Sequence, residues 1–354
     1  MKIVSVIGAR PQFIKSAPLS RQIRKRHTEI LVHTGQHYDP CLSEIFFREL
    51  DIPEPDVNLG IGSGSQGEQT GRMIIALESA IQRISPDLVI VYGDTNSTLA
   101  GAIAASKIPI PIAHVEAGLR SFDPGMPEEI NRVLTDRVST LLFCPTKTSV
   151  ENLAREGIVS GVHLVGDVMA DALRYNADLA EKGSDILGRL CLVPREYLVA
   201  TIHRQSNTDI RGNLEGLVDA FGRVGETVIF PAHPRTLKYL KLYGLERSLP
   251  ENIRLIPPLG YLDMIKLMAN ARKILTDSGG MQKEAYLLKV PCITLRENTE
   301  WVETVEDGWN VLVGTDADLI VRMVKEFTPV HAQKELFGGG NASRKIADIL
   351  DRMG

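Results

Sequence analysis

The sequence has few aromatic residues and almost no excess of charge of either sign. Phe, Tyr and Trp make up 5% of its 354 residues, and the formal net charge is −4. Nucleic-acid-binding domains usually carry a clear basic excess, and single-strand binding also needs aromatic rings for stacking. The composition therefore argues against nucleic acids and membrane surfaces as partners. An anionic small molecule would have to be held by local charges and backbone dipoles.

Cysteine pairs and long apolar runs are also missing. The four cysteines, at positions 41, 144, 191 and 292, lie far apart and show no metal-ligand spacing. We therefore expect buried reduced thiols and no metal ion. No stretch approaches the roughly 20 apolar residues of a membrane span, and the apolar run in "MKIVSVIGARPQF" is too short for a signal peptide. These features predict a cytoplasmic protein.

Short apolar runs recur along the whole chain, with helical patterns between them. At roughly 150 residues per domain, the length predicts two domains. The runs that we interpret as buried strands are 2–8, 29–35, 87–94, 110–118, 140–146, 195–203, 226–234, 252–259, 273–279, 290–296 and 310–314. Because buried parallel strands are continuously apolar and alternate with helices, the pattern predicts an α/β protein with two Rossmann-like doubly wound domains facing across a cleft.

The domain border is predicted near a mostly helical, polar segment, 165–190. We place the N-terminal domain at residues 1–168 and the C-terminal domain at 169–340. The tail "GGGNASRKIADILDRMG" has a glycine hinge followed by an amphipathic helix over about 341–354.

Charged side chains follow several strands of the first domain. In doubly wound sheets the ligand lies beyond the carboxyl ends of the strands, so these positions are the informative ones. The candidate residues of this half are Arg10, Lys15, Asp94, Glu116, Glu128 and Arg132. Carboxylates there suit proton transfer or a cationic transition state, and the cations suit an anionic substrate.

The second half contains the stretch "KILTDSGGMQKEA", in which a glycine turn joins an apolar run to a helix. Two glycines let backbone N–H groups approach an anion, so Ser278, Gly279 and Gly280 form a candidate phosphate site. His203 and His233 follow other strands of this half. The turn is neither a Walker loop nor a G-x-G-x-x-G fingerprint, and no cofactor or hydride transfer is expected.

Each candidate also has a structural interpretation. Asp94 could be a helix N-cap, and His203 a hydrogen-bonded core histidine. Arg10 and Lys15 could each be a surface charge. First-turn acids after Pro127 could serve the helix dipole alone, which is the interpretation we prefer for Glu129.

Taken together, the motifs "GARPQFIK", "GDTNSTLA", "HVEAGLRS", "PEEINR", "HPR" and "TDSGGMQKEA" identify a resemblance. In this order and over essentially the whole length, the chain resembles the non-hydrolysing UDP-N-acetylglucosamine 2-epimerases. The resemblance implies the two-domain GT-B architecture of glycosyltransferases, with the C-terminal helix packing back on the first domain. It also implies a UDP-sugar substrate and a homodimer.

The resemblance assigns roles to the candidate residues. It implies catalytic carboxylates at Asp94, Glu116 and Glu128, and a histidine on the diphosphate side at His203. The remaining positions are expected to bind substrate: phosphate at the Ser-Gly-Gly turn, the ribose hydroxyls at Glu284, and other parts of the substrate at Arg10, Lys15, Arg132 and His233.

The chemistry agrees with such a site. Carbon 2 of the sugar has no adjacent carbonyl, so its proton is too weakly acidic for direct removal. If UDP departs first, the ring becomes oxocarbenium-like and elimination gives a glucal-type alkene. Re-addition of UDP, with protonation from the opposite face, inverts carbon 2. This route needs cations and dipoles at the diphosphate, carboxylates beside the sugar, and exclusion of water.

The sugar itself is less well defined. Many family members have "TERPE" where this chain has "TEWVE", so Trp301 replaces an arginine associated with nucleotide binding. The segments "TGQHYD", "SEIFF" and "TEWVE" also resemble sister enzymes that epimerise UDP-2,3-diacetamido-2,3-dideoxyglucuronate. We favour UDP-N-acetylglucosamine and keep this sugar as the alternative. A GT-B glycosyltransferase and a non-catalytic UDP-sugar sensor are the rival classes.

Overall fold

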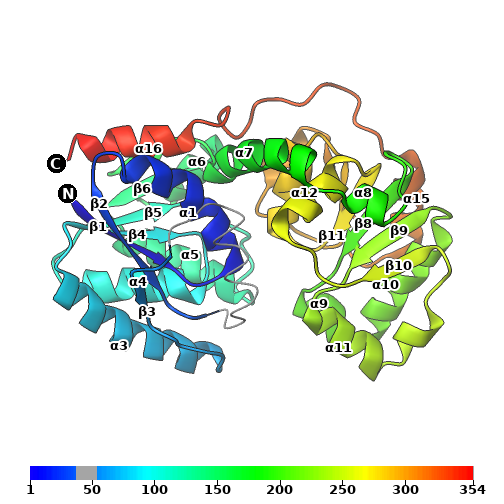
Figure 1. The fold of residues 1–354 in the computed structure, drawn as a ribbon, viewed down its shortest axis with the longest axis horizontal. Coiled ribbons are helices and arrows are strands. Elements are labelled where there is room, and N and C mark those ends of the chain that lie inside the picture. The colour runs from blue at the N-terminus through cyan, green and yellow to red at the C-terminus, as the bar shows by residue number, and fades with distance from the viewer. Residues whose placement is uncertain (37–53, 354) are drawn as a thin grey trace. The chain divides into compact units, whose positions relative to one another are not determined.

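The computed structural model describes residues 1–36 and 54–353, except for the side chains of Arg10 and Pro11. Cys41 and most of the motifs "TGQHYD" and "SEIFF" lie outside the described residues. The chain forms two compact units, Met1–Tyr175 with Glu335–Gly354, and Asn176–Lys334. We call them unit 1 and unit 2 (Figure 1). The sequence predicted domain borders at residues 168 and 340. One helix, α7 (Val168–Gly183), runs through the first border between the units.

Unit 1 is built on a parallel sheet of seven strands in the order β3-β2-β1-β4-β5-β6-β7. The strands are β1 (Lys2–Ile7), β2 (Thr28–His33), β3 (Val57–Asn58), β4 (Leu88–Tyr92), β5 (Ile112–Val115), β6 (Leu141–Cys144) and β7 (Val162–Leu164). The strand order reverses between β1 and β4, which pair in register from Ile3 opposite Leu88. The carboxyl ends of β1, β4 and β5 are therefore neighbours at the switch point where ligands bind.

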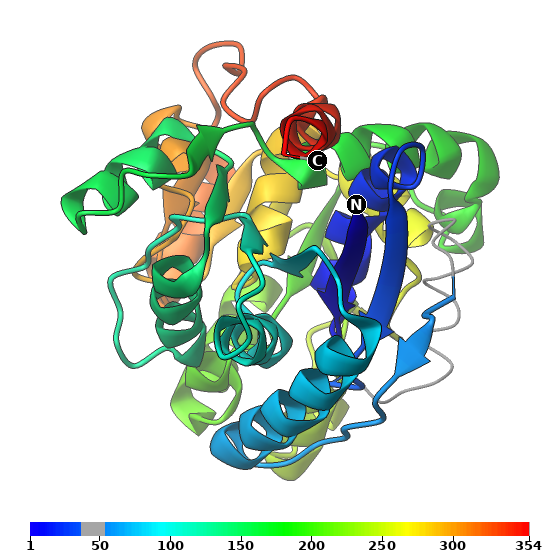
Figure 2. The same ribbon diagram turned by 90° about the vertical axis from the view of Figure 1, so that its left-hand side faces the viewer.

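Helices cover both faces of this sheet. They are α1 (Arg10–Ile23), α3 (Gln66–Ile84), α4 (Asn96–Ser106), α5 (Pro127–Val138), α6 (Lys147–Arg155) and α16 (Ala342–Asp351). α3 and α4 bury Met73, Leu77 and Ala102 with strand residues such as Val4 and Val91. Figure 2 shows α3 on one side of the sheet and α1 with α16 on the other.

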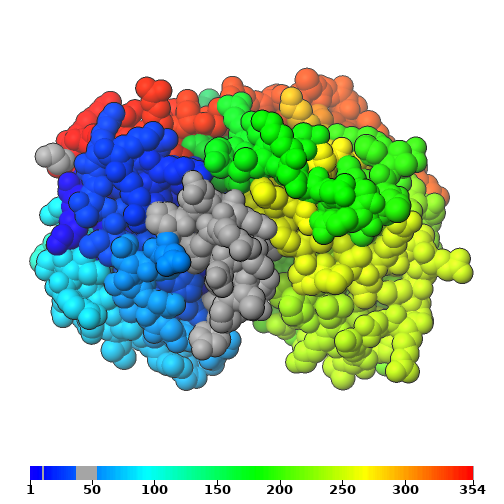
Figure 3. All heavy atoms as spheres, in the orientation of Figure 1, coloured from blue at the N-terminus to red at the C-terminus, as the bar shows by residue number. Residues whose placement is uncertain are grey.

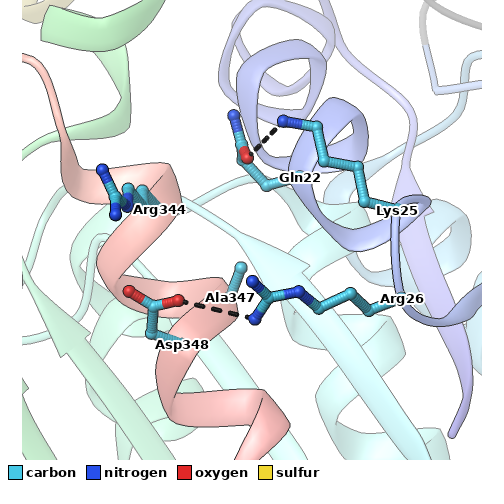
Figure 4. Close-up of a pocket in the computed structure, with 6 residues that line it drawn as sticks. All are labelled: Gln22, Lys25, Arg26, Arg344, Ala347 and Asp348. Atoms are coloured by element: carbon cyan, nitrogen blue, oxygen red, sulfur yellow. Dashed lines mark hydrogen bonds and ion pairs between the residues drawn. The ribbon is translucent and has the colours of Figure 1, made fainter.

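The C-terminal helix α16 packs on α1, so the end of the chain belongs to unit 1 (Figure 3). A cavity of about 390 Å³ lies between the two helices, lined by Gln22, Lys25, Arg26, Arg344, Ala347 and Asp348. In Figure 4, Lys25 points to Gln22, and Arg26 points to Asp348 at 3.7 Å. None of the predicted site residues lines this cavity.

Unit 2 has a parallel sheet of six strands in the order β10-β9-β8-β11-β12-β13. The strands are β8 (Tyr197–Thr201), β9 (Thr227–Pro231), β10 (Ile253–Ile256), β11 (Lys273–Thr276), β12 (Cys292–Thr294) and β13 (Asn310–Leu312). Its switch point lies between β8 and β11, where Thr201 is opposite Thr276. The residues after these two strands, around His203 and Ser278, are thereby brought together.

The helices of unit 2 form two apolar layers. They are α8 (Ile186–Arg189), α9 (Gln205–Thr208), α10 (Arg211–Arg223), α11 (Pro234–Leu242), the 3-10 helix η1 (Leu245–Ser248), α12 (Tyr261–Ala269), α13 (Gly279–Leu287), α14 (Val302–Glu306) and α15 (Ala317–Glu326). One core joins α10, α11 and α15 to the sheet, and the other joins α8, α12 and α13. The predicted α/β architecture is confirmed.

All eleven predicted strands are present, each shorter than its predicted run. The sequence missed β3 and β7, because edge strands of two or three residues carry too little pattern.

One thiol prediction was wrong: Cys144 and Cys292 are buried, but Cys191 is exposed in a turn at φ 49°. Within the described residues, no helix is long and apolar enough to cross a membrane.

Candidate active site

The predicted residues of unit 1 gather at the carboxyl ends of β1, β4 and β5. Lys15, on α1, forms a buried ion pair with Glu116, which follows β5; each residue is 8% exposed. Gly93, after β4, lies against both, since a Cβ there would meet Lys15 Nζ at 2.8 Å and Glu116 Oε2 at 3.3 Å. Gly93 has φ 66°, a backbone conformation that favours glycine, and any larger residue there would crowd this ion pair.

Arg132 of α5 holds a second carboxylate at the same strand ends. Its Nη2 and Nε donate to Asp94 Oδ2 at 2.9 and 3.1 Å, and its Nη1 donates to Glu129 Oε2 at 2.6 Å. Thr95, rather than Asp94, is the N-cap of α4. The Asp94 side chain is one-third exposed and is positioned by a guanidinium that is itself 2% exposed. Two of the candidate residues, Asp94 and Arg132, are therefore direct partners.

Glu129 does more than complement a helix dipole, which corrects our interpretation. Its carboxylate accepts hydrogen bonds from the backbone N–H groups of Ser121 and Phe122, at 2.9 and 3.1 Å, as well as from Arg132. Phe122 has φ 56°, a backbone conformation that non-glycine residues rarely adopt. Glu129 thus fastens the loop after β5 to α5. No sequence pattern predicts these contacts, because the loop partners lie seven and eight residues before Glu129 and outside the helix.

Two predicted residues of unit 1 have less defined surroundings. Glu128, in the first turn of α5, is half-buried, and its side chain has no hydrogen bond or ion pair among the described residues. It lies four residues before Arg132 and hence on a neighbouring part of the helix surface. Arg10 begins α1 at the end of β1, but its side chain is outside the described part of the structure.

A buried polar cluster supports this site from behind. His114, on β5, bonds Asp136 Oδ1 through Nδ1 at 2.7 Å and the Gly93 carbonyl through Nε2 at 2.7 Å. Arg120 donates to Asp136 Oδ2 at 2.7 Å. Burial alone would raise the pKa of Asp136, but the charges and hydrogen bonds of His114 and Arg120 outweigh it and hold the pKa below its usual value. This anchored carboxylate fixes the strand ends that carry Gly93 and Glu116.

In unit 2 the Ser-Gly-Gly turn opens α13 directly after β11. Ser278 is the N-cap, and its Oγ accepts from the Met281 N–H at 3.4 Å. Gly279 is buried and Gly280 is exposed. The first N–H groups of this nine-residue helix have no intrahelical acceptor, and they point outward from the helix at its N-terminal end. The turn has the local form of an anion site, as predicted.

Asp277 joins this turn to His203. Its buried carboxylate accepts from the His203 and Arg204 N–H groups at 3.0–3.1 Å, and it lies 3.0 Å from His203 Nδ1. Burial would raise the pKa of Asp277, but the hydrogen bonds and the charge of His203 hold it below its usual value. Asp277 lies within the stretch "KILTDSGGMQKEA", but the sequence pattern assigned it no role. Its position between an apolar run and a glycine turn was the available signal.

The other predicted residues of unit 2 lie close by. The His233 ring, at the N-cap of α11, has its centroid 5.8 Å from that of His203. Glu284 is buried on α13, and Tyr261 donates to its Oε1 at 3.2 Å. Apart from Arg10 and Glu128, the predicted side chains therefore lie in two groups, one at the switch point of each unit.

The fold is that of an α/β protein with two Rossmann-like units, one with carboxylates and cations at its strand ends and the other with a glycine turn that opens a helix. The family model of the UDP-N-acetylglucosamine 2-epimerases matches residues 21–351. The chain belongs to this family, and it is an isomerase, a UDP-sugar 2-epimerase. The predicted family and enzyme class are confirmed.

Several relatives match over their full lengths. The chain is 57% identical to a UDP-N-acetylglucosamine 2-epimerase homolog of Methanococcus maripaludis, with 99% of each chain covered. It is 46% identical to the UDP-2,3-diacetamido-2,3-dideoxy-D-glucuronate 2-epimerase of Pseudomonas aeruginosa, with 100% of each covered. The Methanocaldococcus jannaschii UDP-GlcNAc 2-epimerase, crystallised with UDP-GlcNAc and UDP, matches with a TM-score of 0.94 and 44% identity over 99% of this chain and 100% of that chain.

Proposed function

We propose that the protein interconverts UDP-N-acetylglucosamine and UDP-N-acetylmannosamine without net hydrolysis. The supporting observation is the grouping of Asp94 and Glu116 with Lys15 and Arg132 at one set of strand ends. Reversible loss of UDP needs acids beside the sugar and cations or dipoles at the diphosphate. The strand ends of unit 1 carry acids and cations, and the α13 turn of unit 2 has the local form of an anion site.

In this proposal Asp94, Glu116 and Glu128 transfer the C2 proton and stabilise the oxocarbenium-like ring. Glu128 is suited to contact with substrate because no described residue engages its carboxylate. Ser278, Gly279 and Gly280 hold the diphosphate, with His203 and His233 on the same side, and Glu284 holds the ribose. Lys15, Arg132 and Arg10 are also substrate-binding residues in this proposal.

The second candidate substrate is UDP-2,3-diacetamido-2,3-dideoxyglucuronate. The Pseudomonas aeruginosa relative, named for that sugar, is 46% identical, against 45% and 44% for two relatives named for UDP-N-acetylglucosamine, although the homolog at 57% carries the latter name. The same elimination and re-addition would serve both sugars, because the 3-substituent and carbon 6 take no part in bond breaking.

Proton NMR of the purified protein in heavy water, with each UDP sugar in turn, tests the function. We expect deuterium to enter at C2 of one sugar and the manno isomer to accumulate. Exchange at C2 of neither sugar would contradict the proposal. A glycosyltransferase would leave the C2 hydrogen in place.

We also propose that the protein is a homodimer. On α5, Ile130, Val133 and Leu134 are 51%, 38% and 43% exposed. They lie at the spacing of one helix face, whereas Glu129 and Arg132 are buried. A second copy packing on this face would remove the apolar stripe from water.

A further inference from the structure

A carboxylate of the protein itself lies against the turn proposed to hold the diphosphate. A Cβ placed on Gly279, the first residue of α13, would be 1.7 Å from Glu300 Oε1 and 2.9 Å from Glu300 Cδ. Glu300 is buried. A negative charge at the start of a helix is favourable alone, but it opposes the arrival of a second anion at the same place.

The neighbours of Glu300 fix it in this position. Thr299 Oγ1 donates to Gln282 Oε1 at 2.6 Å, and the Trp301 ring lies 4.1 Å from Lys283 Nζ. Residues 299–301 therefore contact α13 at positions 279, 282 and 283, which share one helix face. The segment that carries Glu300 is therefore held against α13 by the residue on either side of it.

Arg296 neutralises this carboxylate. Its Nη1 lies 3.0 Å from Glu300 Oε2, and both side chains are 7% exposed. A hydrogen bond from Nη2 to Asn298 Oδ1, at 3.0 Å, orients the guanidinium. In such a poorly solvated place an ion pair has little net charge, whereas the loss of one partner leaves the charge of the other less compensated.

We propose that Arg296 is a positioning residue that sets the affinity of the α13 turn for a diphosphate, by cancelling the charge of Glu300. The inference rests on the proposed binding of a UDP sugar at this turn. Arg296 acts through Glu300: without it, the carboxylate at Gly279 repels the phosphate groups. The effect is confined to ligands that carry phosphate, because the uridine part has no charge to repel.

Calorimetric binding of UDP and of uridine to the full-length protein tests this. We expect Arg296→Gln to raise the Kd for UDP at least tenfold and to change the Kd for uridine by less than about twofold. Adding Glu300→Gln to that variant should return the Kd for UDP to within about threefold of wild type. Glu300→Gln alone should bind UDP as tightly as wild type or more tightly. Arg247→Gln, an exposed arginine of η1, is the matched control.

Three outcomes would overturn the inference. Equal losses of UDP and uridine binding in Arg296→Gln would indicate a structural role alone. Failure of Glu300→Gln to restore binding would show that no charge was being cancelled. If Arg296→Gln does not fold, the test rests on Glu300→Gln alone. A tenfold loss of UDP affinity in Glu300→Gln would then overturn the inference. Wild-type protein that does not bind UDP at all would contradict the proposed function instead.

Discussion

Lys15 and Glu116 form a buried ion pair although 101 residues separate them in the chain. The pair links α1 to the loop after β5, next to Gly93, at the carboxyl ends of the unit 1 strands. A buried carboxylate with a lysine partner is held in one place, as a group that transfers a proton to a bound sugar must be. The pair therefore ties the packing of unit 1 to the proposed chemistry.

The first prediction concerns the acids. Replacing Asp94 by Asn or Glu116 by Gln should lower kcat at least about 10²-fold, because acid–base groups typically contribute 10²–10⁴-fold. The measurement is the rate of C2 deuterium incorporation into the UDP sugar. Glu151→Gln, an exposed acid of α6, is the control and should keep the wild-type rate. Normal rates in both site variants would refute the assignment.

The second prediction concerns Gly279. Gly279→Ala should lower the free energy of unfolding by about 1–3 kcal/mol, because its methyl group meets a Glu300 carboxylate that Arg296 holds. A Cβ on Gly280 would have only Ser278 Oγ within 4 Å, at 3.9 Å, so Gly280→Ala should fold with wild-type stability or better. Urea unfolding of the two variants compares them directly. Equal stabilities would show that Glu300 moves freely.

The third prediction concerns acid stability. The pKa of Asp277 is held below its ordinary value of 3.8, so its carboxylate stabilises the fold above that pH. That stability is lost as the pH falls through the lower, folded-state pKa, because the unfolded chain binds the proton more readily. Asp277→Asn should cost about 2 kcal/mol at pH 7 and less below pH 3.8. Unfolding followed from pH 7 to pH 3 should show the gap closing; a constant gap would contradict it.

The fourth prediction concerns assembly. Leu134→Asp places a charge in the exposed apolar stripe of α5 and should convert the proposed dimer to a monomer. Light scattering after gel filtration gives the mass directly. Ile75→Asp, which changes another exposed apolar residue, on α3, serves as a comparison for a single surface charge. A wild-type protein of monomer mass would refute the dimer itself.

The sequence by itself determined the strands and the positions of the candidate site residues. Continuous apolar runs are a local signal, and the rule that ligands bind beyond parallel strand ends converts them into candidate positions. Asp94, Glu116 and the Ser278–Gly280 turn were found in this way. The edge strands β3 and β7 were not found, since two or three residues carry no distinct pattern. The end of unit 1 was not located to the residue, because α7 continues across it.

Only the tertiary structure decided the partners of these side chains. The pairing of Lys15 with Glu116, the hold of Glu129 on the loop after β5, and the contact of Glu300 with Gly279 all join residues from different elements. Sheet order places these elements side by side, and it depends on how whole layers pack rather than on any short stretch. Local sequence patterns therefore identify the candidate residues of the site, whereas the electrostatic environment of each residue depends on the folded unit.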